Sequence, residues 1–288
     1  MKNFILAARP KTLLAGVLPP TVSYIYFVST QHTHAWGYYQ LCVFGALFIQ
    51  LATNFFNDVI DHEKGADKVR VGPTRVSASG MVEIKTVKLW AWSMVVAAAV
   101  CGVPLILRGG WPFLVLGAIS LYLTFGYTGG KVSLAYRGLG ELFVFLFFGL
   151  FSVMGSYYIY ALELNLKIAL LACMFGSLAT TFIGINNLRD REQDAQVGKL
   201  TMATRMTNQH YQAFIILTIF CPYLLLPFII QSPLGWLMFL NLIPALKLAT
   251  ITYKNKGAEL NEGLKFSGIH LISFSLLMSL GFAYGYLL

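Results

Sequence analysis

Nine long apolar runs dominate the sequence and leave few ways in which the chain can fold. Each run approaches the roughly 20 residues that a helix needs to cross a bilayer. Only 11% of all residues are charged, against about a quarter in a soluble domain. This pattern excludes an ordinary soluble enzyme, a disordered chain and a disulfide-stapled secreted domain. The runs cover residues 13–30, 36–60, 89–107, 111–127, 142–161, 168–188, 211–230, 234–251 and 269–288.

The fold expected from these runs is an all-α, polytopic membrane protein with nine transmembrane helices in one bundle. In lipid an isolated span has to satisfy its own backbone hydrogen bonds, and a helix does so. The runs at 89–107 and 111–127 are separated by Arg108, Gly109 and Gly110 alone, so we expect them to form a helical hairpin.

The basic residues predict the orientation of this bundle. Of the 21 Lys and Arg residues, 18 lie in the N-terminal segment or in the loops after the second, fourth, sixth and eighth runs. Only Arg108 and Lys167 lie in loops on the opposite side. By the positive-inside rule, the N-terminus and the Lys- and Arg-rich loops are cytoplasmic. The net charge of +9 then reflects topology and contact with membrane lipid, not nucleic-acid binding. We expect a multi-pass protein of the cell (inner or cytoplasmic) membrane.

The acidic residues are distributed even less evenly than the basic ones. Eight of the twelve lie in the two cytoplasmic segments that follow the second and sixth runs: Asp58, Asp61, Glu63, Asp67, Glu83, Asp190, Glu192 and Asp194. The positive-inside rule explains the basic residues of these segments but not the acids. Function is therefore expected in these two segments.

Both acidic segments contain the pattern Asn-x-x-x-Asp at the end of a span, followed by a basic loop. Asn57 and Asp61 form the first copy, and Asn186 and Asp190 form the second. On helices, residues 54, 57, 58 and 61 share one face, and residues 186, 190 and 194 share another. A single copy is a weak motif, but two copies at equivalent membrane depth indicate a site.

The chemistry of these residues favours Mg²⁺ and a diphosphate. Carboxylates with amide oxygens, without Cys, suit a hard cation. Adjacent Lys and Arg would complete a phosphate clamp, and the apolar bundle would take a lipid tail. The sequence has no P-loop or kinase signature, so a nucleotide is not expected.

Two alternatives stay open at this point. Helix-terminal Asp and Lys in cytoplasmic loops often serve only as solvated caps, and Asp58, Glu63 and Glu192 lie off the best-aligned faces. A transporter would use the internal repeat as a gate and the acids as ion ligands. That alternative prefers charges near the bilayer midplane, whereas these acids cluster at one surface.

Further motifs establish a resemblance to a known family. They include Ala-Arg-Pro-Lys-Thr-Leu at residues 8–13, Lys-Gly-Ala-Asp at 64–67, Tyr-Thr-Gly-Gly at 127–130 and Leu-Gly-Glu at 139–141. With the two acidic segments, they resemble the UbiA superfamily of membrane-embedded aromatic prenyltransferases. The 1,4-dihydroxy-2-naphthoate polyprenyltransferase branch is the most similar. The matches extend from residue 8 to about residue 205, and the last three spans contain no motif that we can match.

The resemblance implies a single domain over residues 1–288, with a cytoplasmic cap over a central cavity. It implies Mg²⁺-dependent transfer of a polyprenyl group, with two ions, from a polyprenyl diphosphate to 1,4-dihydroxy-2-naphthoate. The ring would lose its carboxylate and give demethylmenaquinone, in menaquinone biosynthesis. The alternative acceptor is 4-hydroxybenzoate or another aromatic ring. Neither the acceptor nor the tail length follows from the sequence, because both depend on the shape of the cavity.

The resemblance also assigns expected roles to individual residues. The metal positions are Asn57, Asp61, Asp190 and Asp194. The residues expected at the diphosphate are Arg70, Arg75, Lys131, Asn186, Lys199 and Arg205. The residues expected at the acceptor are Arg9, Asn54 and Glu141. The residues expected in catalysis are Asp67, Lys131 and Tyr127.

Two of these residues have alternative roles. Many relatives have an Asp four residues after the position of Asp61, where this chain has Gly65. Asp67 is its replacement, and it could serve either as a metal ligand or as a general base. Glu141 begins an apolar run, where it could serve in the site or cap the helix.

Overall fold

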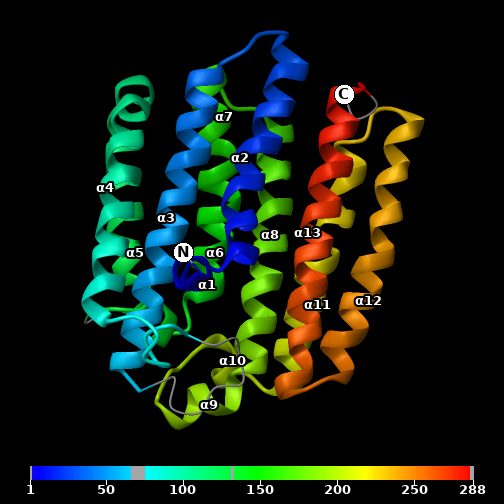
Figure 1. The fold of residues 1–288 in the computed structure, drawn as a ribbon. Helices are drawn as coiled ribbons and strands as arrows, with labels where there is room; N and C mark the ends of the chain where they lie inside the picture. The colour runs from blue at the N-terminus through cyan, green and yellow to red at the C-terminus, as the bar shows by residue number, and fades with distance from the viewer. Residues whose placement is uncertain (1, 66–74, 131–132, 286–288) are drawn as a thin grey trace.

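The computed structural model describes residues 2–65, 75–130 and 133–285, and every regular element in these ranges is a helix (Figure 1). The predicted all-α class is therefore confirmed. Four single helices in the described ranges are long and apolar enough to cross a membrane: α2 (Pro10–Gln31), α3 (Trp36–Glu63), α4 (Ile84–Gly109) and α8 (Leu166–Arg189).

Four further spans are composed of consecutive helical segments. The first consists of α6 (Gly140–Val144), the π-helical η2 (Phe145–Met154) and α7 (Gly155–Ala161). The others pair an α-helix with a 3₁₀ segment: α11 (Asn208–Leu225) with η3 (Leu226–Phe228), η4 (Pro233–Asn241) with α12 (Leu242–Lys254), and η5 (Gly257–Glu259) with α13 (Leu260–Ala283).

Eight candidate spans are thus present in the described residues, and the predicted count was nine. The remaining apolar run forms α5 (Trp111–Gly126), whose 16 residues are about 24 Å long at 1.5 Å per residue. That length is less than the roughly 30 Å of a bilayer core. Gly110 alone separates α4 from α5, as expected for a helical hairpin.

The last span begins earlier than its hydropathy indicates. The prediction was residues 269–288, whereas α13 begins at Leu260 and ends at Ala283. Glu262 and Lys265 are exposed in its first two turns. Leu260, Gly263 and Ser267 are buried on the opposite face. This amphipathic beginning lowers the mean hydropathy, although the helix already packs against the bundle.

Helix α8 forms the centre of the bundle, with α4 and α5 on one side of it and α11 to α13 on the other (Figure 1). Its contact with η2 depends on glycine. A Cβ on Gly149 would lie 2.5 Å from the Ala172 carbonyl oxygen and 2.6 Å from the Gly176 Cα. Small residues let helix backbones approach closely in membranes, and this approach fixes the position of the helix that ends in the second acidic segment.

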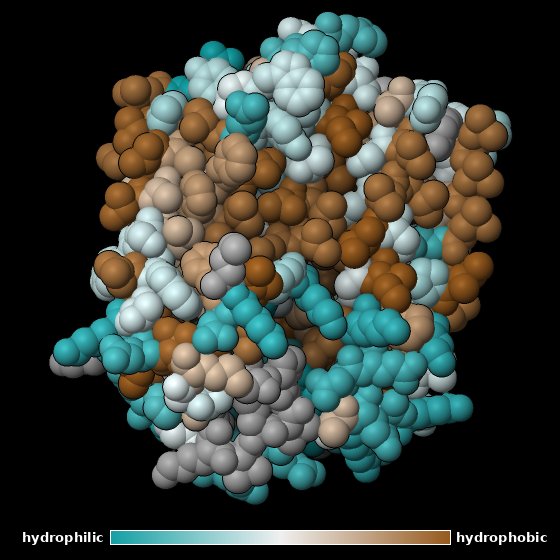
Figure 2. Space-filling view, viewed as in Figure 1, coloured by the Kyte–Doolittle hydropathy of each residue, from teal (hydrophilic) through white to brown (hydrophobic). Residues whose placement is uncertain are grey.

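The surface separates into an apolar region and a polar end (Figure 2). On the face shown, apolar side chains dominate the middle, and hydrophilic side chains gather at the lower end, with a smaller group at the top. Two short helices, α9 (Arg191–Gln196) and α10 (Met202–Arg205), lie at that lower end. The apolar outer face of α4 includes Leu89, Val100 and Leu107, which are all exposed. The chain is a multi-pass membrane protein, and its acidic segments lie at the polar end.

Candidate active site

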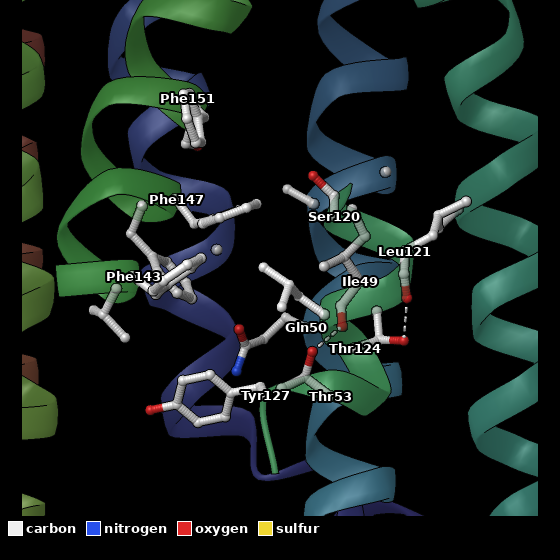
Figure 3. Close-up of a pocket in the computed structure, with 18 of the residues that line it drawn as sticks. Ile49, Gln50, Thr53, Ser120, Leu121, Thr124, Tyr127, Phe143, Phe147 and Phe151 are labelled. Carbon is white, nitrogen blue, oxygen red and sulfur yellow. Dashed lines mark hydrogen bonds between the residues drawn. The ribbon is translucent and has the colours of Figure 1, made fainter. Parts of the chain in front are cut away.

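A cavity of about 650 Å³ lies inside the bundle and has a polar end and an apolar end. Helices α2, α3, α4, α5 and α8 line it together with the composite span 140–161. Its charged and amide lining residues are Arg9, Gln50, Asn54, Asn57, Asp61, Arg75, Asn186, Asn187 and Lys199. Figure 3 shows part of the wall, where Phe143, Phe147 and Phe151 lie one above another opposite Ser120, Leu121 and Thr124.

The first acidic motif lies at the last turns of α3. The Arg75 Nη2 atom is 2.6 Å from Asp61 Oδ2 and donates a hydrogen bond to it. Arg75 also donates to the carbonyl oxygen of Asn57. The Asn57 side-chain oxygen accepts from the Thr128 hydroxyl at 2.5 Å, and the Tyr136 hydroxyl donates to Asp61 at 3.3 Å. Asn57 and Asp61 are thereby held in fixed positions at the cavity.

The neighbouring Asp58 has a different partner and a different role. The residue is 1% exposed, and its carboxylate accepts hydrogen bonds from the backbone N–H groups of Val76 at 3.2 Å and Ser77 at 2.9 Å. Asp58 does not line the cavity. It attaches the chain that returns at residue 75 to the end of α3, which brings Arg75 beside Asp61.

We expect Asp58→Ala to lower the free energy of unfolding by about 1–3 kcal/mol, because two buried N–H groups lose their acceptor. The change would appear as a lower Tm of the detergent-solubilised protein. Glu63→Ala is the matched control: Glu63 pairs with Lys88 at 2.7 Å, but both side chains are nearly half exposed. Its loss should cost at most about 1 kcal/mol. Equal Tm changes in the two variants would contradict this role for Asp58.

The second acidic motif lies where α8 ends and α9 begins. Arg189 donates to both carboxylate oxygens of Asp190, at 2.7 and 2.6 Å, and to the Asn186 side-chain oxygen at 2.9 Å. Asp194 lies one turn further along the chain and is 5% exposed. Its Oδ1 is 3.3 Å from the Lys199 Nζ, and its Oδ2 is buried without a hydrogen-bond partner among the described residues.

Lys199 brings the two motifs together electrostatically. Burial works against its charged form, but Asp194, Asp61 and Asp190 outweigh burial and raise the pKa of Lys199 above its ordinary value. Burial also raises the pKa of Asp194 to about 6, although Lys199 acts in the opposite direction. The partly buried ammonium group of Lys199 thus interacts with carboxylates that are more than 100 residues apart in sequence.

The donor set fits Mg²⁺ bound together with a phosphate ligand. The Asn and Asp side chains of the two motifs offer only oxygen atoms as metal ligands. Asp194 Oδ2 is buried without a hydrogen-bond partner among the described residues, and a bound cation would satisfy it. Within the described ranges, no group of three or more His, Cys, Asp or Glu residues could hold a metal ion alone. Mg²⁺ is usually held by one or two carboxylates, with substrate phosphates and waters completing its shell.

The structure places the remaining predicted residues in three groups. Arg9, Asn54 and Tyr127 line the cavity. Glu141 and Arg205 are not part of its lining, and the Arg205 Nε binds the Leu200 carbonyl oxygen at 3.1 Å on the exposed surface. The predictions for Asp67, Arg70 and Lys131 lie outside the described residues.

Two of the lining residues also hold the N-terminal helices in place. Arg9 has a left-handed φ of 51° and separates α1 (Lys2–Ala8) from α2, which begins at Pro10. The Asn54 amide nitrogen donates to the Ala8 carbonyl oxygen at 2.8 Å and to the Thr12 hydroxyl at 2.9 Å. Together they connect α3 to the start of α2.

Glu141 lies behind the cavity wall and is 1% exposed. One carboxylate oxygen accepts from the Tyr211 hydroxyl at 2.5 Å and from the Asn187 amide at 2.9 Å. Asn187 itself lines the cavity. Gly140 leaves room for Tyr127, since a Cβ there would be 2.8 Å from the tyrosine oxygen. Glu141 therefore does not face the cavity itself, but it holds Asn187, which does.

The sequence did not predict three hydrogen-bonded contacts of the site. They are the Thr128 hydroxyl on Asn57, the Tyr136 hydroxyl on Asp61 and the Arg189 clamp on Asp190. Burial and the nearby Asp61 raise the pKa of Tyr136, so its hydroxyl stays protonated and donates. The position of Arg189 next to Asp190 was a visible signal. Thr128 belongs to the Tyr-Thr-Gly-Gly motif at residues 127–130, but the sequence did not indicate that it or Tyr136 contacts α3, because only tertiary packing brings them there.

These features of the site agree with the comparison against known families. The model of the UbiA prenyltransferase family matches residues 17–262. The chain belongs to the UbiA prenyltransferase family. It is therefore an enzyme of the prenyltransferase class, as the motifs predicted, and the transporter alternative is set aside.

Individual UbiA relatives agree with this assignment. The 1,4-dihydroxy-2-naphthoate octaprenyltransferase of Haemophilus influenzae is 33% identical over 257 residues, which are 85% of this chain and 83% of that protein. The Escherichia coli enzyme of the same name is 35% identical over 211 residues, 69% of this chain and 68% of that protein. A UbiA homologue from Archaeoglobus fulgidus, solved bound to GPP and Mg²⁺, shares the fold. Its TM-score is 0.64 at 13% identity, over 98% of this chain and 99% of that one.

Proposed function

We propose that this UbiA protein transfers a polyprenyl group from a polyprenyl diphosphate to 1,4-dihydroxy-2-naphthoate and releases carbon dioxide. The product would be demethylmenaquinone, a step of menaquinone biosynthesis. The observation that carries the proposal is one cavity whose polar end includes Asn57 and Asp61 of the first motif and Asn186 of the second, together with Lys199, and whose remainder is largely apolar. Asp190 and Asp194 do not line the cavity, but Lys199 connects it to Asp194 at 3.3 Å. Such a cavity suits a donor with a charged head and a lipid tail. The names of the similar enzymes support the naphthoate acceptor.

In this proposal the two acidic motifs hold two Mg²⁺ ions, one at Asn57 and Asp61 and one at Asp190 and Asp194. Mg²⁺ supplies positive charge that offsets the negative charge of a departing diphosphate. Arg75 and Lys199, which line the cavity, would add positive charge and bind phosphate oxygens. Arg70 and Lys131 would add further charge, and the Asn186 amide would donate a hydrogen bond to the diphosphate. The A. fulgidus homologue, solved with Mg²⁺ and a prenyl diphosphate, supports this assignment.

In the reaction, the bond between the acceptor ring and its carboxylate is replaced by a bond between the ring and the prenyl group. The allylic carbon–oxygen bond of the donor breaks, and its electron pair leaves with the diphosphate. The ring carbon that bears the carboxylate then forms the new carbon–carbon bond. The carboxylate leaves as carbon dioxide, and its electron pair restores the aromatic ring. We propose that Arg9 and Asn54 orient the acceptor and that Glu141 positions Asn187. Asp67 would serve either as a metal ligand or as a general base that takes the proton of a ring hydroxyl, and Lys131 would stabilise the charge of the departing diphosphate.

The apolar wall protects this chemistry from water. Phe143, Phe147 and Phe151 form one side of the cavity (Figure 3), and a dry cavity prevents capture of the allylic cation by water. Aromatic faces, including that of Tyr127, stabilise positive charge through cation–π contacts. The distribution of Lys and Arg supports a cytoplasmic position for the polar end, in the cell (inner or cytoplasmic) membrane.

An acceptor panel tests the proposed function. Purified protein would receive octaprenyl diphosphate and Mg²⁺, with either 1,4-dihydroxy-2-naphthoate or 4-hydroxybenzoate as acceptor, and the products would be identified by mass. We expect prenylated product from the naphthoate alone, complete loss on chelation and recovery on adding Mg²⁺. Product from hydroxybenzoate alone would select that acceptor instead. Activity that survives chelation would contradict the metal proposal.

A further inference from the structure

The part of the cavity far from the acidic motifs is bounded by two different walls. Phe143, Phe147, Phe148 and Phe151 line the side formed by the span 140–161. The other wall, on α3, α4 and α5, mixes bulky apolar side chains with small residues, among them Gly45, Ala98, Gly102 and Gly117. The glycines of this wall are the positions at which a tail could approach the helix backbones.

Two glycines of this wall differ from the other glycines that line the cavity. An ideal Cβ on Gly102 of α4 or on Gly117 of α5 would meet nothing within 4 Å. A Cβ on Gly45 would contact Cys101 at 3.6 Å, and one on Gly16 would contact α3 at the same distance. Gly102 and Gly117 thus face open space, whereas Gly16 and Gly45 serve helix packing.

Both glycines lie well away from the diphosphate end. Gly117 precedes Tyr127 by ten residues, which corresponds to about 15 Å along a helix. The cavity extends along α3 from Asp61 to Cys42, a distance of about 28 Å at the same rise. The first isoprene units of a donor would lie near Tyr127, and only later units would reach Gly117 and Gly102.

We propose that Gly102 and Gly117 form the surface along which the distal isoprene units lie, and that these two positions set the donor lengths that the enzyme accepts. This inference rests on the proposed function. Side chains at either position would occupy the space of the distal units, leaving the metal motifs and the proximal units untouched. Short donors would still bind, and long donors would be excluded.

A competition assay with Gly117→Leu and Gly102→Leu tests the inference. Each variant would receive equal amounts of geranyl and octaprenyl diphosphate with a saturating acceptor, and the ratio of the two products would be measured. We expect the ratio to shift towards the geranyl product by about tenfold or more relative to the unmodified chain, because overpacking acts only on the longer tail. The ratio does not depend on how much of the variant folds.

The matched control is Gly268→Leu on α13. A Cβ there also meets nothing within 4 Å, but Gly268 does not line the cavity. Its product ratio should equal that of the unmodified chain. Gly117→Ala should shift the ratio in the same direction as Gly117→Leu, by less. Unchanged ratios in both leucine variants would overturn the inference. Absence of any product from the unmodified chain would overturn the proposed function instead.

Discussion

Replacing Asp61 with Asn should lower kcat/KM for the prenyl diphosphate by about 10³-fold, which is the scale of losing one preorganised electrostatic group. Asp61 lines the cavity at its polar end, beside Arg75 and within the field of Lys199. Steady-state kinetics in detergent would measure the loss. Activity close to that of the unmodified chain would contradict a role for Asp61 in the reaction.

A structural role for Asp61 would also reduce activity, because the substitution disturbs a buried ion pair with Arg75. Titration with Mg²⁺ separates the two causes. If Asp61 binds the metal, the Mg²⁺ concentration for half-maximal activity should rise by about 10–100-fold. A purely structural loss would lower the maximal rate and the Tm and leave that concentration unchanged. Glu63→Gln, at the exposed end of the same helix, should change neither the maximal rate nor the Mg²⁺ concentration for half-maximal activity.

Replacing Lys199 with Gln should lower kcat/KM by about 10²-fold. Lys199 interacts with both motifs, with Asp194 at 3.3 Å and the charges of Asp61 and Asp190 acting on it. Its removal leaves a cluster of carboxylates that repels an anionic donor. We therefore expect most of the loss as a higher KM for the diphosphate, measured with the acceptor saturating.

Arg205→Gln is the matched control for Lys199. Both residues follow the second acidic motif in sequence, but Arg205 is exposed and binds a loop carbonyl outside the cavity. The Arg205 variant should retain nearly all of the activity. If the Arg205 variant lost as much activity as the Lys199 variant, both basic residues would contribute to the diphosphate site. Lining the cavity would then not distinguish the role of Lys199 from that of Arg205.

The membrane spans and the acidic motifs could be predicted because both depend on local sequence. Apolar runs of sufficient length specify helices, and residues four apart share a helix face. The prediction was least accurate for the last span, where α13 begins at Leu260 instead of residue 269. Polar residues on its outer face concealed the buried positions that already pack in the bundle.

Helical spacing could not assign roles to the individual acids. Asp58 and Asp61 lie three residues apart near the end of α3, yet Asp58 accepts hydrogen bonds from the backbone N–H groups of residues 76 and 77, whereas Asp61 lines the cavity. The difference depends on where the chain returns after α3. Lys199 and Arg205 likewise carry the same charge in the same loop, and only tertiary packing directs one of them into the cavity.

The most direct test of the account is the fate of the acceptor carboxylate in the acceptor assay. The protein would receive octaprenyl diphosphate, Mg²⁺ and 1,4-dihydroxy-2-naphthoate labelled at its carboxyl carbon. The account predicts one labelled carbon dioxide for each prenylated product, and neither product in the presence of a chelator. A prenylated product that retains the labelled carboxylate, or no prenylated naphthoate at all, would contradict it.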